Sequence, residues 1–302
     1  MTDKPNPFLL FLKALWRGFK RLPFISDFLG DYPRLTMVRL SGIIADSNVR
    51  KQGLSHCRLA KIIDKAFARP GIKGVVLVIN SPGGSPAQSQ LIGNHIRALA
   101  EEKDLPVYAF IEDVAASGGY WLACAADEIY AQESSVIGSI GVISSGFGME
   151  GLIDRYDIKR RLYTAGKDKS FMDPFSPERK DDVARLKTLL GDMHDIFKDW
   201  VRDRRAGLLK EEEKSLFEGG FWLGAKAVDL GLIDGIGDAR EMIREKFGKD
   251  ARLIDLTPER KFPFSPFGAR LPGAMGVPEE YSLADDIIAT LETRAEWNRY
   301  GL

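Results

Sequence analysis

One serine in this sequence stands where it could act as a nucleophile. Ser117 follows the apolar run VYAFIE at 107–112 and precedes Gly118, Gly119 and the helix-like run YWLACAA. A serine hydroxyl can attack a carbonyl carbon when a base removes its proton and neighbouring N–H groups hold the resulting oxyanion. The same Ser-Gly-Gly stretch also suits the start of a helix, because serine is favoured at the N-cap. Taken alone, the stretch favours the cap.

A second glycine-rich loop follows another apolar run. NSPGG at 80–84 comes after GVVLVIN at 74–80. Both apolar runs predict parallel strands buried on two faces, and the loops after such strands line the ligand-binding edge of an open sheet. Because glycine has no side chain, the backbone N–H groups of these loops can approach a substrate closely. The two loops therefore predict a nucleophile and oxyanion-binding amides on one edge, with two plain strand–helix turns as the alternative.

A nucleophilic serine needs a base. All three histidines lie in predicted helices, where surface positions are the simpler explanation: His56, His95 and His194. A lysine can replace histidine in Ser–Lys pairs, provided that it is desolvated and so loses its proton more readily. The polar loop TAGKDKSFMDPF at 164–175 offers Lys167 and Lys169. Two solvated loop lysines are the alternative explanation of that loop.

Composition excludes several other functions. The 43 Lys and Arg residues balance 43 Asp and Glu residues, so no net charge attracts nucleic acid to the chain. Cys57 and Cys124 have no paired motif and are predicted to be reduced, buried, small apolar residues in a cytosol-like compartment. The cysteines and histidines show no zinc-ligand spacing. We expect neither a metal nor a cofactor.

The elements that must position these residues alternate between strand and helix. Strand-like runs at 35–45, 74–80 and 106–111 alternate with helical stretches at 54–68 and 87–102. This alternation is typical of βαβ units and predicts an α/β fold. The remaining predictions are short β segments within 128–166, a long charged helix within 177–217, two short helices within 224–247, an irregular tail at 257–280 and an amphipathic helix at 281–297.

The N-terminal residues have the pattern of a basic amphipathic helix. Apolar residues recur at helical spacing from Phe8 to Leu22, and basic residues occupy the other faces: Lys13, Arg17, Lys20 and Arg21. Such a helix can lie in the interface of an anionic membrane or dock on protein. The apolar run at 8–12 is too short to span a bilayer, and Arg17, Lys20 and Arg21 follow it where a signal peptide would place small residues, so we expect no signal peptide.

Five stretches in order resemble the SppA/SohB signal peptide peptidase family: VINSPGG (78–84), VAASGGYWLACAAD (114–127), SVIGSIGV (135–142), TAGKDKSFMDPF (164–175) and FEGGFWLGAKAVDLGLIDGIGD (217–238). The resemblance implies a ClpP/crotonase-like α/β fold of repeated ββα units with a mostly parallel sheet. Three regions are therefore expected: an N-terminal basic amphipathic helix and linker at 1–34, a peptidase domain at 35–250, and an irregular C-terminal extension at 251–302.

The resemblance also implies a serine peptidase with a Ser–Lys dyad. Ser117 matches the family's nucleophile and Lys169 its general base, which makes Lys167 the second choice. Supporting roles fall on further positions: Ser139 helps to orient the lysine, Gly84 and the amide of Gly118 form the oxyanion hole, and Gly83 shapes that loop. Two alternatives remain: a crotonase-like acyl-CoA enzyme, which would bind CoA and need no nucleophile, and an inactive scaffold that binds extended peptides.

The expected assembly and substrates follow from the same resemblance, whereas the expected location follows from the cysteines and the amphipathic stretch. Family members form rings or domes in which the serine and lysine of one site come from neighbouring protomers. We therefore expect a homo-oligomer with shared sites that cleaves peptides, proteins or membrane-derived signal peptide remnants. Many members carry an N-terminal transmembrane helix, whereas this chain has the amphipathic stretch at 8–22. We expect a cytoplasmic protein, peripheral at the inner face of an anionic membrane, with no nucleic-acid partner.

Overall fold

A computed structural model describes residues 32–46, 53–210, 213–257, 297–298 and 300. The helix expected near the N-terminus lies outside these residues, as does most of the C-terminal extension. One sheet contains all of the strands: β1 (Arg34–Ser41), β2 (Ile72–Ser81), β3 (Val107–Ala116), β4 (Glu128–Ala131), β5 (Val136–Gly138), β6 (Phe221–Leu223), β7 (Gly235–Ile236) and β8 (Arg252–Asp255). The helices are α3 (His56–Ala68), α4 (Pro86–Lys103), α5 (Gly118–Ala123), α6 (Glu150–Arg155), α7 (Lys180–Arg204), α8 (Glu213–Leu216), α9 (Gly224–Leu230) and α10 (Ala239–Phe247).

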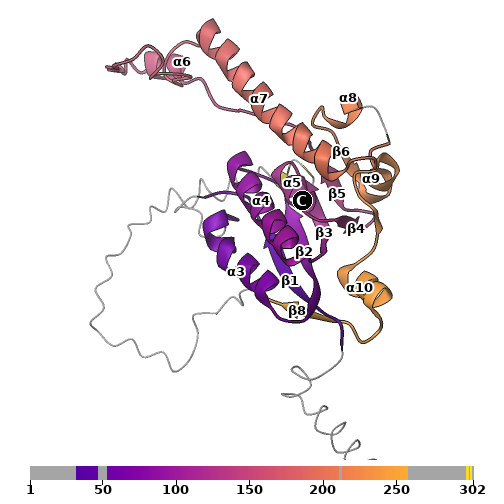
Figure 1. Cartoon of the computed structure of the whole chain (residues 1–302). Coiled ribbons are helices and arrows are strands. Elements are labelled where there is room, and N and C mark those ends of the chain that lie inside the picture. Colours follow the sequence, from indigo (N-terminus) through magenta and orange to yellow (C-terminus); the bar gives the residue numbers. More distant parts are fainter. Residues whose placement is uncertain (1–31, 47–52, 211–212, 258–296, 299, 301–302) are drawn as a thin grey trace, which may run out of the picture.

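The sheet is mostly parallel. Its strand order is β6-β5-β3-β2-β1-β8, with β4 paired to β3 and β7 (Figure 1). Every pairing is parallel except that between β5 and β6. The first half of β3 pairs with β4 and its last residues pair with β5, so that β5 ends beside the end of β3. This architecture confirms the predicted α/β fold with a mostly parallel sheet.

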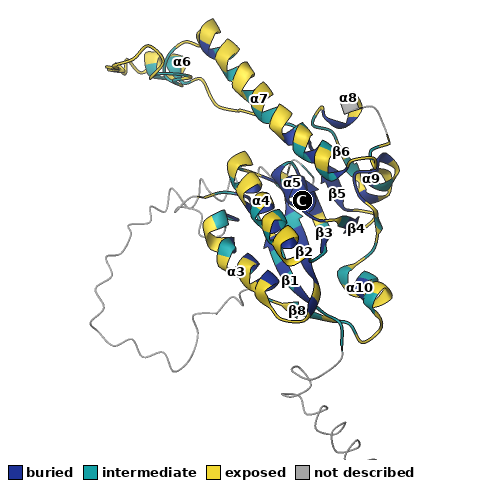
Figure 2. Ribbon diagram, viewed as in Figure 1, coloured by how far each residue is buried: buried dark blue, intermediate teal, exposed yellow. Residues whose placement is uncertain are grey.

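Strand β2 is buried on both faces, as its apolar sequence predicts. Val75, Leu77 and Ile79 belong to the core cluster shared with α3 and α4, whereas Val76 and Val78 belong to the cluster that includes Ile243 of α10. Successive side chains of a strand point to opposite faces, so a continuous apolar run needs a covering layer on each side. Figure 2 shows the buried strands behind the exposed outer surfaces of α3 and α4.

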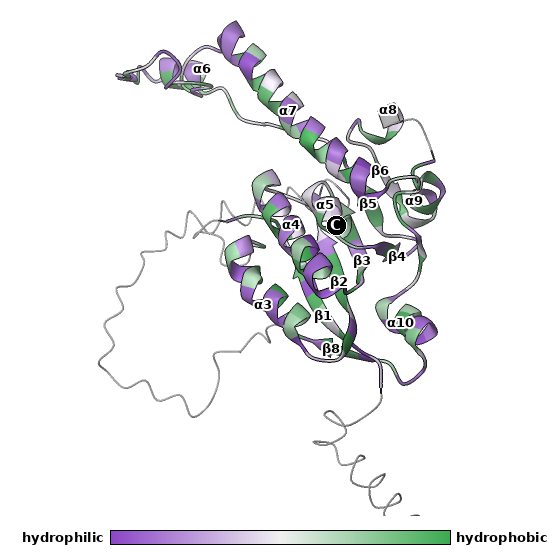
Figure 3. Cartoon of the chain, in the orientation of Figure 1, coloured by the Kyte–Doolittle hydropathy of each residue, from purple (hydrophilic) through white to green (hydrophobic). Residues whose placement is uncertain are grey.

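Helix α7 carries a projecting arm, which we define as residues 143–179. The C-terminal end of α7 packs on the core through Phe197 and Trp200, whose rings stack on Trp121 of α5. The arm lies at the opposite end of α7, away from the sheet (Figure 1). Hydrophobic residues recur along α7 (Figure 3). The arm itself exposes many large apolar side chains: Ile143, Phe147, Leu152, Tyr156, Ile158, Leu162, Tyr163 and Met172.

Several local expectations differ from the structure. The predicted burial of Cys57 is wrong, because the buried stripe of α3 runs through Leu59 and Ile63 and leaves Cys57 exposed, whereas Cys124 is buried. Short β segments were expected throughout 128–166, but residues 158–166 form no strand. Three short strands were not expected: β6, β7, and β8, which pairs with β1 and carries the sheet to Asp255. Among the described residues, no helix has the length and apolarity needed to cross a bilayer.

Candidate active site

Ser117 forms the corner between β3 and α5 in a backbone conformation that residues with side chains rarely adopt. Its φ is 51° and its ψ is −121°. Such a conformation costs about 1–3 kcal/mol and persists only where the surroundings enforce it. Here the Ser117 amide donates a 2.8 Å hydrogen bond to the Gly138 carbonyl, and the Ser117 carbonyl accepts a 3.0 Å bond from the Trp121 amide. The hydroxyl makes no capping hydrogen bond to α5, so it is not engaged as a helix cap.

The glycine loop after β2 lies directly against this corner. A Cβ added to Gly83 would come 2.8 Å from the Cβ of Ser117 and 2.9 Å from the nitrogen of Gly118. Gly83 and Gly84 have φ values of 108° and 142°, in a region that strongly favours glycine. The Gly83 carbonyl accepts a 2.8 Å hydrogen bond from the Ile44 amide, which ties the loop to the segment after β1. The two glycine-rich loops therefore meet at Ser117.

Two backbone amides beside Ser117 remain available. The nitrogen of Gly84 lies 3.4 Å from the position of a Cβ added to Gly118, so the two residues are in contact. Neither amide donates a hydrogen bond to another group in the described part of the chain. A pair of such donors next to a hydroxyl can stabilise the oxyanion of a tetrahedral intermediate. Because α5 has only six residues, its dipole is small, and an oxyanion at this position would be stabilised mainly by hydrogen bonds from these two amides.

Close packing also explains why glycine follows Ser117 twice. A Cβ on Gly119 would come 2.3 Å from the Ser81 carbonyl oxygen, and a Cβ on Gly118 would come 2.4 Å from Ser89 Oγ. The Ser89 hydroxyl is held in place because it donates a 2.9 Å hydrogen bond to the Ser85 carbonyl. The start of α5 is therefore pressed against the end of β2 and the start of α4, which fixes the direction of β3 as it reaches Ser117.

Ser139 lies next to this corner, although it comes from a different strand end. It follows Gly138, whose carbonyl accepts the hydrogen bond from the Ser117 amide. Its own φ is 52°, and its amide donates a 2.6 Å hydrogen bond to the Gly220 carbonyl. Ser139 is 9% exposed, and its Oγ lies 3.3 Å from the hydroxyl of Tyr300.

Both candidate lysines lie on the arm and are exposed. Neither Lys167 nor Lys169 forms a hydrogen bond or ion pair with Ser117 among the described residues. Asp168, between the two lysines, forms an ion pair with Arg185 of α7. The ion pair holds this part of the arm at the N-terminal end of the helix.

Helix geometry shows how far the lysines are from Ser117. Trp200, at the other end of α7, donates a 3.0 Å hydrogen bond to the carbonyl of Trp121, one turn from Ser117. A helix rises about 1.5 Å per residue, so roughly 22 Å of helix separates Arg185 from Trp200. Within one chain, Lys169 therefore lies well beyond hydrogen-bond reach of Ser117.

None of the three histidines forms a hydrogen bond with Ser117 among the described residues. His56 Nε2 lies 3.2 Å from His95 Nδ1, and His95 Nε2 lies 2.9 Å from a carboxylate oxygen of Asp64. This chain of contacts joins α3 to α4, so these histidines are partly buried rather than simple surface residues. His194 Nε2 lies 3.3 Å from the Ile140 carbonyl. Among the described residues, no group of three or more metal-ligating side chains is arranged to hold an ion.

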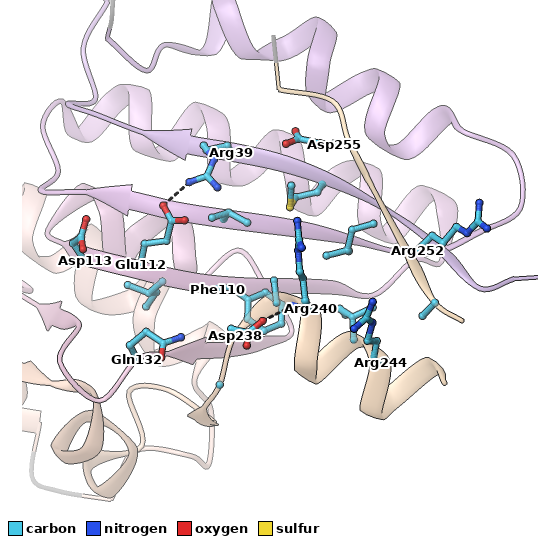
Figure 4. Close-up of a pocket in the computed structure, with 18 of the residues that line it drawn as sticks. Arg39, Phe110, Glu112, Asp113, Gln132, Asp238, Arg240, Arg244, Arg252 and Asp255 are labelled. Atoms are coloured by element: carbon cyan, nitrogen blue, oxygen red, sulfur yellow. Dashed lines mark hydrogen bonds and ion pairs between the residues drawn. The ribbon is translucent and has the colours of Figure 1, made fainter. Parts of the chain in front are cut away.

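A hollow of about 950 Å³ opens on the sheet face that α10 partly covers (Figure 4). Its walls combine apolar strand residues such as Phe110 with charged side chains. Arg39 and Glu112 form an ion pair at one end, and Asp238 accepts hydrogen bonds from two amides at the start of α10. The lining includes neither Ser117 nor Ser139, so this hollow is separate from the candidate active site.

Sequence reasoning did not identify the aromatic residues at the C-terminal end that reach the site. Trp297 and Tyr300 pack against a cluster formed by Val114, Ala116 and Val136. The aromatic residues WNRY near the end of the chain were visible in the sequence, but no local pattern indicates which surface they contact. The hydroxyl contact of Tyr300 with Ser139 joins residues that are 161 positions apart.

Comparison with known proteins connects the site to a family. A model of peptidase family S49 matches residues 99–251, a stretch that contains Ser117, Ser139 and Lys169. The Na(+)/H(+) antiporter NhaA of Brucella abortus is 44% identical over 89% of this chain and 37% of that protein. The putative signal peptide peptidase SppA of Enterococcus faecium is 29% identical over 74% of this chain and 65% of that protein. The probable protease SohB of Haemophilus influenzae is 30% identical over 60% of this chain and 50% of that protein. The alignments thus span less than two thirds of each relative.

Proposed function

This chain belongs to peptidase family S49, and on that premise we propose that it is a serine peptidase of the SppA type, with Ser117 as the nucleophile and Lys169 as the general base. The observation that carries the proposal is the pair of available amides at Gly84 and Gly118, in contact with the strained Ser117 corner. An oxyanion hole beside a hydroxyl with no capping role suits acyl transfer. The substrates would be peptides, including remnants of membrane-derived signal peptides.

The reaction would proceed through an acyl-enzyme. The neutral amine of Lys169 takes the proton of the Ser117 hydroxyl while the serine oxygen bonds to the peptide carbonyl carbon, and the amides of Gly84 and Gly118 hold the oxyanion. The intermediate collapses as the C–N bond breaks, and the protonated lysine donates its proton to the leaving amine. Water then attacks the ester, gives a proton to the lysine and releases the acid, and that proton returns to Ser117.

The base must reach Ser117 from a second copy of the chain. Within one protomer, the ion pair of Asp168 with Arg185 holds the adjacent Lys169 at the N-terminal end of α7, whereas Trp200 at the other end of that helix lies beside the corner. A lysine must leave bulk water before it can act as an efficient base. The arm exposes large apolar side chains such as Phe147, 86% exposed, and Tyr163, 90% exposed. Such a surface marks an interaction site. We propose that each arm docks on a neighbouring protomer of a ring or dome, where Lys169 of the partner subunit meets Ser117 and Ser139.

A fluorophosphonate probe tests the chemistry. Its phosphorus forms a bond to a nucleophilic serine oxygen as fluoride leaves, so mass spectrometry locates the modified residue. We expect covalent labelling of Ser117 in the full-length protein and none in the Ser117→Ala chain. A crotonase-like acyl-CoA enzyme or an inactive scaffold would leave Ser117 unlabelled and would contradict the proposal.

Mixing two inactive chains tests the shared site. Equal amounts of Ser117→Ala and Lys169→Ala chains would place an intact serine beside an intact lysine in about a quarter of randomly assembled sites. We expect peptide hydrolysis to return after subunit exchange. A mixture that stays inactive, although exchange is shown by differently tagged chains, would overturn the shared site and leave the nucleophile assignment standing.

The N-terminal residues carry a further part of the proposal. We propose that the basic amphipathic stretch at 8–22, which lies outside the described residues, holds the protein at the inner face of an anionic membrane. Liposome flotation would show binding to anionic vesicles that weakens in high salt, because salt screens surface charges. The antiporter name of the Brucella relative describes a protein that lies mostly outside the alignment, so we do not propose ion transport for this chain.

A further inference from the structure

The last described residues of the chain cover a small apolar surface beside Ser117. We call this surface the shelf and define it by Val114, Ala116, Val136 and Phe221. Trp297 and Tyr300 pack against the first three of these residues, and the Tyr300 ring meets the Phe221 ring edge-on, with centroids 5.4 Å apart. Ala116 directly precedes Ser117. The C-terminal aromatic residues therefore lie against the strand that carries the candidate nucleophile.

Tyr300 also engages the polar group of the site. Its hydroxyl lies 3.3 Å from Ser139 Oγ, at hydrogen-bond distance. Phe221 pairs with Gly138 in the β5–β6 ladder, so the ring contact and the hydroxyl contact fall on the same strand end. Ser139 is only 9% exposed with Tyr300 in place. A second large side chain that is to contact Ser139 Oγ from this side would have to displace Tyr300.

The shelf suits two different apolar segments, the chain's own C-terminal residues and the arm of a second copy. The shelf accepts Trp297 and Tyr300, and the arm of the chain exposes side chains of the same kind, including Phe147 and Tyr163. Under the proposed function, the arm of a second copy must bring Lys169 of the partner subunit to Ser139. An apolar surface that borders Ser139 is where such an arm would bury its exposed apolar residues.

We infer that the shelf is a docking surface for a second copy of this chain, and that the chain's own C-terminal residues compete with the partner's arm for it. This inference rests on the proposed function, because it assumes that the arm must approach Ser139. In the isolated protomer, Trp297 and Tyr300 cover the shelf, and Tyr300 engages the Ser139 hydroxyl. Completion of the active site requires them to leave. The C-terminal residues thus act as an internal competitor of assembly.

Substitutions at the end of the full-length chain test the inference. We expect Tyr300→Ala to raise the rate of fluorophosphonate labelling of Ser117 about fivefold, the factor that one aromatic contact of mid-range strength represents. Tyr300→Phe keeps the ring against Phe221 and removes only the hydroxyl, so its effect should be smaller. Sedimentation velocity should show a larger oligomeric fraction for Tyr300→Ala than for the unchanged chain at the same concentration.

A peptide added in trans gives an independent measurement. A synthetic peptide with the sequence of residues 295–302 should slow the labelling of the Tyr300→Ala chain, whereas the same peptide with alanine in place of both aromatic residues should not. This comparison uses one protein and so does not depend on the folding of different variants.

The possible failures are distinguishable. If Ser117 is labelled specifically, but Tyr300→Ala leaves the rate within twofold or lowers it, the competition is refuted and the proposed function stands. Peptides that are equally ineffective with and without their aromatic residues would refute it too. If the Ser117→Ala chain is labelled as strongly as the unchanged chain, the proposed function itself fails.

Discussion

The amide of Ser117 donates a 2.8 Å hydrogen bond to the carbonyl of Gly138. This bond joins the end of β3 to the end of β5 and places Ser139 beside the candidate nucleophile. Both serines have positive φ values, 51° and 52°. The two strand ends therefore form one corner that is fixed within the protomer. The group that completes the site must approach this corner from outside.

The two candidate lysines can be separated by substitution. Lys169→Ala should lower peptide hydrolysis by at least about 100-fold, because a positioned general base contributes 10²- to 10⁴-fold. Lys167→Ala, the matched control two residues away, should change hydrolysis less than about threefold, since it removes a solvated charge. Steady-state hydrolysis of a fluorogenic peptide measures both. A larger loss at Lys167 would assign the base to that residue instead.

Gly119 should tolerate no side chain. Its added Cβ would lie 2.3 Å from the Ser81 carbonyl oxygen, so Gly119→Ala should lower the free energy of unfolding by at least about 2 kcal/mol. Gly191→Ala is the control, because nothing lies within 4 Å of its added Cβ. In the middle of α7 this change should raise the free energy of unfolding by up to about 1 kcal/mol. Urea unfolding at constant pH measures both, and equal effects would show that the packing at Gly119 is not as described.

Arg205 should be needed to hold α7 on the core. It is 2% exposed, and its guanidinium forms hydrogen bonds of 2.9 and 3.1 Å to the Asp234 carboxylate and of 2.9 and 3.1 Å to the Gly231 carbonyl. Arg205→Ala leaves that carboxylate without its partner and should lower the free energy of unfolding by about 3 kcal/mol.

Lys159→Ala is the control for this substitution. It breaks an ion pair whose side chains are 75% and 86% exposed, and should cost less than about 0.5 kcal/mol. Thermal unfolding followed by circular dichroism would compare the two variants. Similar melting temperatures would mean that the buried pair adds no more than a surface pair.

The two thiols should differ in reactivity. Burial raises the pKa of the Cys124 thiol to about 12, whereas Cys57 is exposed on α3. Because only the thiolate reacts, iodoacetamide at pH 8 should modify Cys57 alone in the folded protein and both residues in urea. Intact-protein mass spectrometry counts the adducts. A doubly modified folded protein would show that Cys124 becomes accessible.

The arm should loosen in acid. Despite the upward pull of desolvation, hydrogen bonds from Ser176 and Arg160 hold the pKa of the Asp173 carboxyl below its ordinary value. A lowered folded pKa means that this stabilisation is complete above the unfolded pKa, about 3.9, and is lost as the pH falls through the folded value. The protection factors of amides in residues 143–179, which correct the observed exchange for its intrinsic pH dependence, should therefore fall below about pH 4.

The control for this effect is Asp173→Asn, which cannot ionise. In that variant the protection factors of the arm should already be low at pH 7, with little further change in acid. Protection of the arm that does not depend on pH in either protein would contradict the role of Asp173.

The sequence alone determined the alternation of strands and helices and the position of the two glycine-rich loops. It could do so because a strand or helix that is buried on one or two faces has apolar residues at a characteristic spacing. It also supplied the candidate residues Ser117 and Lys169 through a resemblance of ordered motifs. Short strands such as β6 have too few residues to show a period, and they form only because a neighbouring strand, here β5, offers free backbone groups.

Only the tertiary structure decided which of these residues meet. It brought Gly83 and Ser139 to Ser117, held Lys169 away on the arm, and placed Tyr300 on the shelf. The physical reason is that residue types and their spacing indicate which side chains must be buried. They do not indicate which distant residues those side chains contact. Tyr300 and Ser139 are 161 positions apart, and their contact depends on the summed packing of every element between them.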